Sequence, residues 1–223
     1  MPKSIGSIHR HHGNFGHKVR CMAYLMALGS DGVKRMSAVA TLAARYLFSR
    51  LEGRFNTLPA NNKTEKVMHE FILTLSPELF AKIEAAGVPK ALVISRVGKL
   101  FLDFGFHAPT VAFPEVYGLM VEPTESYTKA ELDRFADAVL TMLDLIEEKP
   151  EVLLTVPHFT PIDRVEETAA NKAPVLSEKI TELPAILENR KEPAALWGMP
   201  LNDIKAAIYD AHMQAMGAVE AGC

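Results

Sequence analysis

The strongest constraint on the fold is a helix whose start is encoded next to Thr128. Thr128 is a favourable N-cap residue, and Glu131 follows at the spacing of a capping box. Four apolar residues then recur at intervals of three and four, so one face of this helix must pack against a core. Lys149-Pro150 ends the helix near Glu148. The apolar residues are Leu132, Phe135, Val139 and Met142.

Around this helix the pattern predicts further helices and short strands. Helices are expected on both sides of the break Gly29-Ser30-Asp31-Gly32, where Ser30 or Asp31 can cap the second one. The expected helices are 15–28, 33–51, 77–86, 89–104, 128–148 and 202–218, and the expected strands are 68–75, 110–113 and 118–121. This order predicts an α+β domain in which helices pack on one face of a small sheet, in two layers. The segments 59–66 and 158–174 are polar and are expected to be loops.

Composition and charge exclude several classes of function. With 24 Lys+Arg against 27 Asp+Glu, the net charge of −3 favours neither nucleic acid nor an anionic membrane as a partner. No apolar run approaches the ~18–20 residues of a membrane helix. The first residues lack the apolar core of a secretory signal. Cys21 and Cys223 are too few for a disulfide framework, so a reducing, cytoplasmic location is expected.

Two features near the N-terminus invite a functional interpretation. His9, His11, His12 and His17 lie close together and could bind a metal ion, but they lack the well-separated ligand pairs of a closed zinc site. We therefore expect no metal here and favour a loop that leads into a helix. Lys18 follows His17, as in some Schiff-base sites, but it falls inside an amphipathic helix, where a solvated lysine is the simpler interpretation.

A better candidate for a cleft lies between the predicted helix 89–104 and the helix at Thr128. His107 stands between Gly105, which ends one helix, and Pro109, which restricts the entrance to a strand. Such a position can direct a side chain into a cleft. The segment Glu122–Ser126 places carboxylates and hydroxyls just before the next helix. On spacing alone, a satisfied loop histidine and a capping Glu-Thr pair are the favoured explanations of the two segments.

Several separated segments, in the right order, resemble one family. DFGFHAPT (103–110), LMVEPTES (119–126) and KAELDRF (129–135) resemble the C-terminal domain of glycine decarboxylases, the P-proteins of the glycine cleavage system, and MHEFILTL (68–75) resembles the strand that precedes them. The likeness covers 2–176, which defines the expected domain 1–176. The remaining 177–223 is expected to be an extension with an amphipathic helix.

The two flanks of these segments resemble the same family. Residues 2–6 followed by 13–37 look like the stretch just after the catalytic domain of P-proteins. Residues 157–176 are similar to the tail of subunit 2 of the two-subunit bacterial and archaeal form.

The resemblance implies a small domain of an aspartate-aminotransferase-like, fold-type I enzyme. That enzyme uses pyridoxal phosphate to decarboxylate glycine, releases CO2 and passes the aminomethyl group to the lipoyl arm of H-protein. The family's Schiff-base lysine lies upstream of the present domain, and Lys18 does not replace it. We therefore expect no covalent binding of pyridoxal phosphate and no activity without the large domain or subunit 1. The residues expected at the cleft are His107, Thr110, Glu122, Thr124 and Glu125, with His69 and Asn14 as weaker candidates.

One alternative from a different class is a stand-alone binding or assembly module. In that reading 177–223 covers the surface that the family buries against its large domain. The apolar face predicted for the helix 202–218 would allow this.

Overall fold

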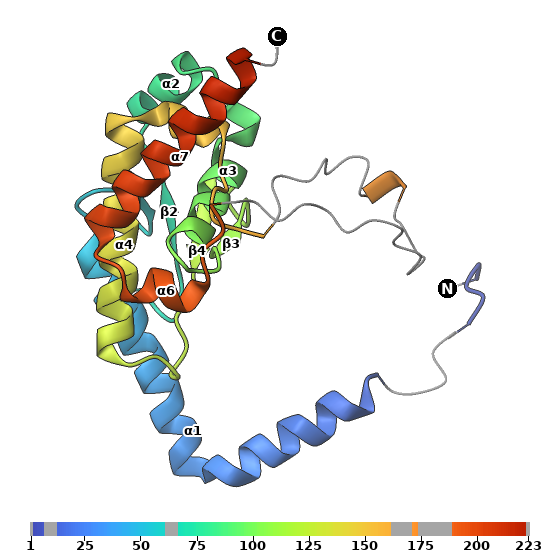
Figure 1. The fold of residues 1–223 in the computed structure, drawn as a ribbon. Helices are drawn as coiled ribbons and strands as arrows, with labels where there is room; N and C mark the ends of the chain where they lie inside the picture. The colour runs from blue at the N-terminus through green and yellow to red at the C-terminus, as the bar shows by residue number, and fades with distance from the viewer. Residues whose placement is uncertain (1, 7–12, 61–66, 162–170, 174–188, 222–223) are drawn as a thin grey trace.

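The structure is a computed structural model that describes residues 2–6, 13–60, 67–161, 171–173 and 189–221. A small sheet lies among helices, and the N-terminal half of the first helix, residues 15–27, projects away from the body as an arm (Figure 1). The elements are α1 (Phe15–Leu51), β1 (Asn56–Leu58), β2 (Phe71–Thr74), α2 (Pro77–Ala85), α3 (Lys90–Asp103), β3 (Thr110–Val111), β4 (Gly118–Val121), α4 (Lys129–Glu148), η1 (Pro150–Leu154), α6 (Pro193–Gly198) and α7 (Leu201–Ala221).

The sheet is antiparallel throughout, with the strand order β1-β2-β4-β3. Leu73 of β2 lies opposite Leu119 of β4, and both are buried. Phe71 on the same face meets Phe48 of α1 edge to face, with ring centroids 5.5 Å apart. On the other face Ile72 and Met120 remain partly exposed. Helices cover one face of a small sheet, which confirms the predicted α+β class.

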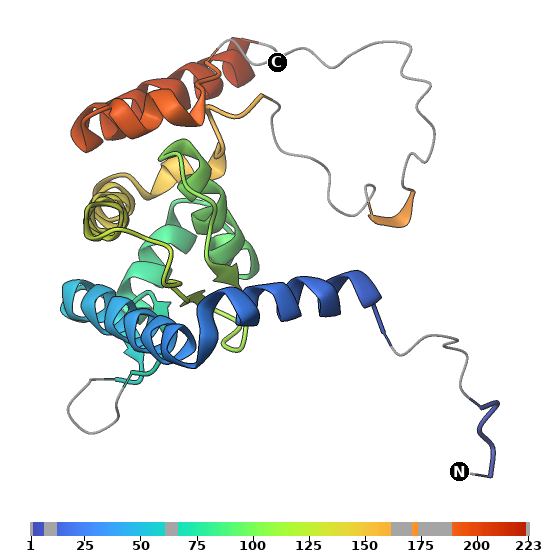
Figure 2. The same cartoon turned by 90° about the horizontal axis from the view of Figure 1, so that it is seen from below.

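The capping box at Thr128 is formed as predicted. The Glu131 carboxylate accepts a hydrogen bond from the Thr128 backbone N–H at 2.7 Å, and the Glu131 N–H donates to Thr128 Oγ1 at 3.3 Å. The helix that follows, α4, lies between α1 and α7 (Figure 2). It buries Ala136, Val139 and Met142 in the core.

The break predicted at residues 29–32 is a single kink. Gly29 adopts φ 63° and ψ −178°, which a residue with a side chain rarely adopts, and helix continues on both sides of it. The two predicted helices are therefore the two halves of α1. The C-terminal half buries Ala44, Leu47 and Phe48 against the body, whereas residues 15–27 are exposed along their whole length.

Some elements were not predicted, and some predicted strands were too long. β1 was missed because it has three residues, of which only Thr57 is buried. η1 and α6 were missed because each is a single short stretch that begins with proline. The strand predicted over 68–75 is only Phe71–Thr74, since residues 68–70 are exposed. The strand predicted over 110–113 ends at Val111. Of the predicted loops, 61–66 and most of 158–174 lie outside the described residues.

The predicted C-terminal helix is confirmed as α7. Ile204 and Ile208 are fully buried in the same core as the sheet and α4, and Leu196 of α6 joins them. Among the described helices, none combines the length and apolar character that crossing a membrane requires.

Candidate functional site

A cavity of about 370 Å3 opens between the loop after α3, the end of β4, the start of α4 and the short helix α6. Its walls are mainly apolar and aromatic, with a few polar groups, which is the usual make-up of a small-molecule site. The lining residues are Leu47, Gly105, Phe106, His107, Ala108, Pro109, Val121, Glu122, Pro123, Tyr127, Glu131, Leu132, Phe135 and Trp197.

The turn after α3 brings His107 to this cavity. Gly105 adopts φ 81°, its N–H donates to the Leu102 carbonyl at 3.0 Å, and the Phe106 N–H donates to the Phe101 carbonyl at 2.9 Å. This pair of bonds is a Schellman motif, as the C′ glycine predicted. The chain then turns sharply, so that His107 lines the cavity and stays exposed to solvent.

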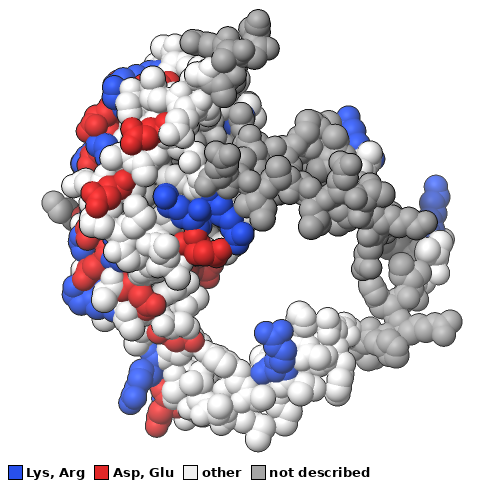
Figure 3. Space-filling view, in the orientation of Figure 1, with Lys and Arg blue, Asp and Glu red and all other residues white. Residues whose placement is uncertain are grey.

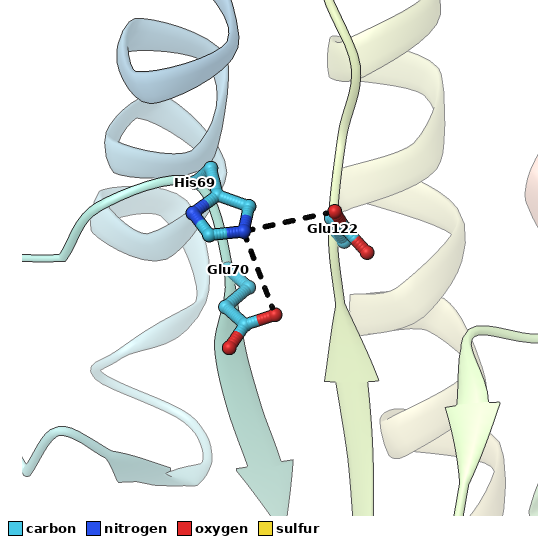
Figure 4. Close-up of side chains that lie close together, drawn as sticks. All are labelled: His69, Glu70 and Glu122. Carbon is cyan, nitrogen blue, oxygen red and sulfur yellow. Dashed lines mark ion pairs between the residues drawn. The ribbon is translucent and has the colours of Figure 1, made fainter. Parts of the chain in front are cut away.

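A cluster of three side chains lies where β2 begins and β4 ends. His69 Nε2 is 3.8 Å from both Glu70 Oε2 and Glu122 Oε1 (Figure 4). One ligand atom from each of the three lies within 4.8 Å of the others, so the group could coordinate a cation. All three side chains are about half exposed, and water can solvate their charges. Two of the predicted residues, His69 and Glu122, are thus neighbours at the rim of the cavity.

Glu125 joins the loop before α4 to the arm of α1. The Tyr24 hydroxyl donates to Glu125 Oε1 at 2.6 Å. This hydrogen bond lowers the pKa of Glu125 and raises the pKa of Tyr24. The contact crosses about a hundred residues of sequence and ties the arm to a predicted site segment.

The remaining predicted residues are not among those that line the cavity. Thr110 is exposed in β3, opposite Met120. Thr124 Oγ1 accepts a hydrogen bond from the Ser126 N–H at 3.3 Å, which is a local turn contact. Asn14 is the N-cap residue of α1 and makes no side-chain capping bond. The structure therefore places His107 and Glu122 on one cavity, with His69 beside Glu122, whereas Thr110, Thr124 and Asn14 lie apart from it.

Sequence reasoning missed the aromatic wall of the cavity. Phe106 lies 5.5 Å from Phe135 and 5.2 Å from Trp197, measured between ring centroids. Phe135 was identified only as a helix-face residue, and Phe106 stood in the segment singled out for its histidine. Trp197 lies some ninety residues further along the chain, and nothing in its local sequence indicates this contact.

The cavity lining does not suit pyridoxal phosphate by itself. Among the residues that the structure describes, its titratable side chains are one imidazole, one phenol and two carboxylates, and none of the described lining residues is a lysine or an arginine. It supplies no amine for a Schiff base and no cation for a phosphate. An apolar group that carries a hydrogen-bond donor or a positive charge would fit these walls better.

Of the N-terminal histidines, His17 is exposed on α1, and His9, His11 and His12 lie outside the described residues.

The arm of α1 presents apolar side chains to solvent. In the space-filling view charges of both signs are interspersed over the body, whereas the arm is mostly uncharged (Figure 3). Phe15 and Met26 are 76% and 72% exposed, respectively. An apolar stripe of this kind is typical of a surface that another molecule covers. The other large apolar residues exposed on the arm are Val19, Met22, Tyr24 and Leu25.

Comparisons with known proteins agree with this picture. A family profile described as "Glycine dehydrogenase, C-terminal domain" matches residues 36–154. Proteins named "Probable glycine dehydrogenase (decarboxylating) subunit 2" are similar in sequence. The one from Chlorobium phaeovibrioides is 41% identical over 173 residues, 77% of this chain and 33% of the relative. The one from Chloroherpeton thalassium is 38% identical over 174 residues, again 77% and 33%. The one from Pyrococcus furiosus is 38% identical over 180 residues, 79% and 34%.

The chain thus spans about a third of the length of these relatives. The matched profile covers more than half of the chain and includes the helix at Thr128, the cavity loop and all four strands of the sheet. The predicted resemblance to P-proteins is confirmed. The chain belongs to the family of glycine dehydrogenase C-terminal domains.

Proposed function

We propose that this chain is the small domain of a glycine-decarboxylating enzyme and works together with a larger partner. The partner is either a large catalytic domain or subunit 1 of the two-subunit form. The complete enzyme would release CO2 from glycine with pyridoxal phosphate and pass the aminomethyl group to the lipoyl arm of H-protein. The observation that carries the proposal is the exposed apolar arm of α1, which is tied to the cavity rim by the Tyr24–Glu125 hydrogen bond.

The arm supports a protein partner on energetic grounds. Burial of a large apolar side chain from water contributes about 1.5–3 kcal/mol. Phe15, Met22 and Met26 are each more than 60% exposed, and together they provide a strip on which a partner can dock. The family profile describes a C-terminal domain, so the remaining part of the relatives lies on the N-terminal side, where the arm points. In a fold-type I arrangement, the arm and the surface around the cavity opening would both face the large domain.

In this proposal the partner holds the cofactor. Pyridoxal phosphate acts as an electron sink in such reactions. The described part of the cavity lining contains no lysine, so the present chain would shape the mouth of the site with His107 and Glu122 and exclude water with its aromatic wall. Thr110, Thr124, Glu125, His69 and Asn14 remain proposed contacts of the partner or of H-protein. We infer that the chain alone does not decarboxylate glycine, and that the enzyme is cytoplasmic.

The proposal keeps the division into 1–176 and 177–223. The three relatives described above match 77% to 79% of the chain. The first part would be the domain shared with P-proteins, and the second part an addition that packs on it through α6 and α7.

The proposal is tested by reconstitution. The chain is mixed with the N-terminal two thirds of the Chloroherpeton relative, with subunit 1, H-protein and pyridoxal phosphate, and CO2 release from carboxyl-labelled glycine is measured. We expect CO2 release from the mixture and none when the chain is omitted. Glu122→Gln should lower the rate at least tenfold, whereas the matched control Glu84→Gln, on the exposed side of α2, should not.

Two outcomes would contradict this function. One is CO2 release by the chain and pyridoxal phosphate alone, abolished by Lys18→Ala. The other is an inactive mixture in which the proteins do form a complex. The second outcome would favour the alternative, a stand-alone binding or assembly module, for which the packing of α6 and α7 on the domain is the supporting observation.

A further inference from the structure

The register of the two central strands brings two carboxylates face to face. Phe71, the first residue of β2, lies opposite Val121, the last residue of β4, and both side chains are buried. The antiparallel register, continued by one residue, places Glu70 opposite Glu122. Because side chains alternate between the two faces of a strand, both carboxylates lie on the face of the sheet that the helices leave uncovered.

This pairing is unfavourable unless a positive charge compensates it. Directly opposed residues of an antiparallel pair have Cβ atoms about 4.5–5.5 Å apart, and like charges at such positions repel. One imidazole faces both carboxylates, since His69 Nε2 lies 3.8 Å from Glu70 Oε2 and 3.8 Å from Glu122 Oε1 (Figure 4). Among the described residues, His69 is the only basic one that forms an ion pair with either carboxylate. A neutral imidazole offers a lone pair but no charge, so a bound cation would complete the cluster.

One imidazole nitrogen and two carboxylate oxygens form a donor set for a divalent metal ion. The three ligand atoms all lie within 4.8 Å of one another. Zn2+ binds such atoms at about 2.0–2.2 Å, which places the ligand atoms of a tetrahedral site about 3.4 Å apart. The two distances from His69 must therefore shorten by about 0.4 Å. All three side chains are about half exposed and free of close packing, so small rotations can supply this movement.

The imidazole selects the class of ion. Mg2+ and Ca2+ take oxygen ligands, whereas an imidazole nitrogen suits Zn2+ and its first-row neighbours. Two carboxylates balance the double charge of such an ion. Three protein ligands leave the fourth tetrahedral position to water or another molecule, as in catalytic rather than structural zinc sites. Glu122 also lines the cavity, so this open position would lie at the cavity rim.

We propose that His69, Glu70 and Glu122 form a binding site for Zn2+ or a similar first-row divalent metal ion at the rim of the cavity. The ion neutralises the two opposed carboxylates and links the start of β2 to the end of β4. It also converts Glu122 from a free anion at the cavity mouth into a metal ligand. This inference does not depend on which reaction the cavity serves, because it concerns the binding of an ion and is tested without an activity assay.

The test measures Zn2+ binding to the full chain by isothermal titration calorimetry. His9, His11 and His12 are replaced by glutamine in every protein tested, because closely spaced imidazoles could bind the same ion. We expect one bound Zn2+ per chain, which a large excess of Mg2+ does not displace. His69→Gln and Glu70→Gln should each raise the Kd at least about tenfold, because even the loss of a group behind a metal ligand costs about 10–100-fold in affinity.

Matched variants and a second readout locate the ion. Glu122→Gln should raise the Kd as much as His69→Gln does. The controls are His17→Gln on α1 and Glu84→Gln on α2, which remove an exposed imidazole and an exposed carboxylate elsewhere and should leave the Kd unchanged. In NMR spectra of the imidazole groups, the signals of His69 should shift when Zn2+ is added, and those of His17 should not.

Three outcomes overturn the proposal. The first is no binding at Zn2+ concentrations up to about 1 mM. The second is a Kd that His69→Gln leaves unchanged. The third is displacement of Zn2+ by Mg2+ at equal concentration, which would indicate a general attraction of cations to acidic side chains. If circular dichroism shows that a substitution unfolds the protein, the NMR titration with His69 in place decides: a Zn2+-dependent shift of its signals supports the site, and its absence overturns it.

Discussion

Gly105 is the position where a single added methyl group should disturb the cavity most. Its φ of 81° lies in the left-handed region, which costs a residue with a side chain about 1–2 kcal/mol. A Cβ atom built there would lie 3.1 Å from the Cβ of Leu196 and 3.4 Å from the Pro193 carbonyl oxygen. Neither is the flexible end of a side chain, so α6 must shift, and overpacking of this kind costs about 1–3 kcal/mol.

Gly105→Ala should therefore lower the free energy of unfolding by about 2–5 kcal/mol. With an m value near 2 kcal/mol/M, the urea midpoint should fall by about 1–2.5 M. The measurement is urea unfolding followed by circular dichroism and by Trp197 fluorescence. Gly53→Ala is the matched control, because a Cβ at Gly53 meets nothing within 4 Å. A Gly105→Ala protein within about 0.5 kcal/mol of the wild type would refute the reasoning, since ordinary surface substitutions already span that range.

Three further substitutions test the fold and the arm. Thr128→Ala removes the capping box and should cost about 1 kcal/mol in urea unfolding; an unchanged midpoint would contradict it. Phe48→Ala opens a cavity beside Phe71 and should cost about 3–5 kcal/mol, which thermal unfolding would show; a cost below 1 kcal/mol would be inconsistent with its burial. Tyr24→Phe removes the donor to Glu125 and should raise the carboxyl pKa measured by NMR, since that bond lowers it. The lowered pKa of Glu125 means that the Tyr24–Glu125 hydrogen bond is favoured while the carboxyl is ionised, so in the wild type this bond should weaken as the pH falls through the pKa of Glu125. A Glu125 pKa that does not change in Tyr24→Phe would refute the hydrogen bond.

The longer helices were predictable from the sequence because their signals are local, whereas the short η1 and α6 were not. The capping box at Thr128, the Schellman glycine at 105 and the break at Gly29 each depend on residues within one or two turns. β1 could not be predicted, because a three-residue strand contains too few positions to show alternation and is stabilised by pairing with β2.

The candidate site was only partly predictable for the same reason. His107 and Glu122 lie in segments whose glycine, proline and helix-capping residues mark turns in the sequence, and both line the cavity. Trp197 reaches the cavity only through the packing of α6, and the pairing of Asp103 with His158 spans 55 residues. Such contacts depend on tertiary packing, which local periodicity does not encode.

We infer that this domain acts through a protein that docks on its arm and its cavity face. Hydrogen exchange of the chain with and without the N-terminal two thirds of the Chloroherpeton relative tests this directly. We expect protection of residues 15–27, together with 105–109 and 122–127, while α2 exchanges unchanged. Protection confined to α2, or no protection under conditions in which the mixture releases CO2, would contradict it.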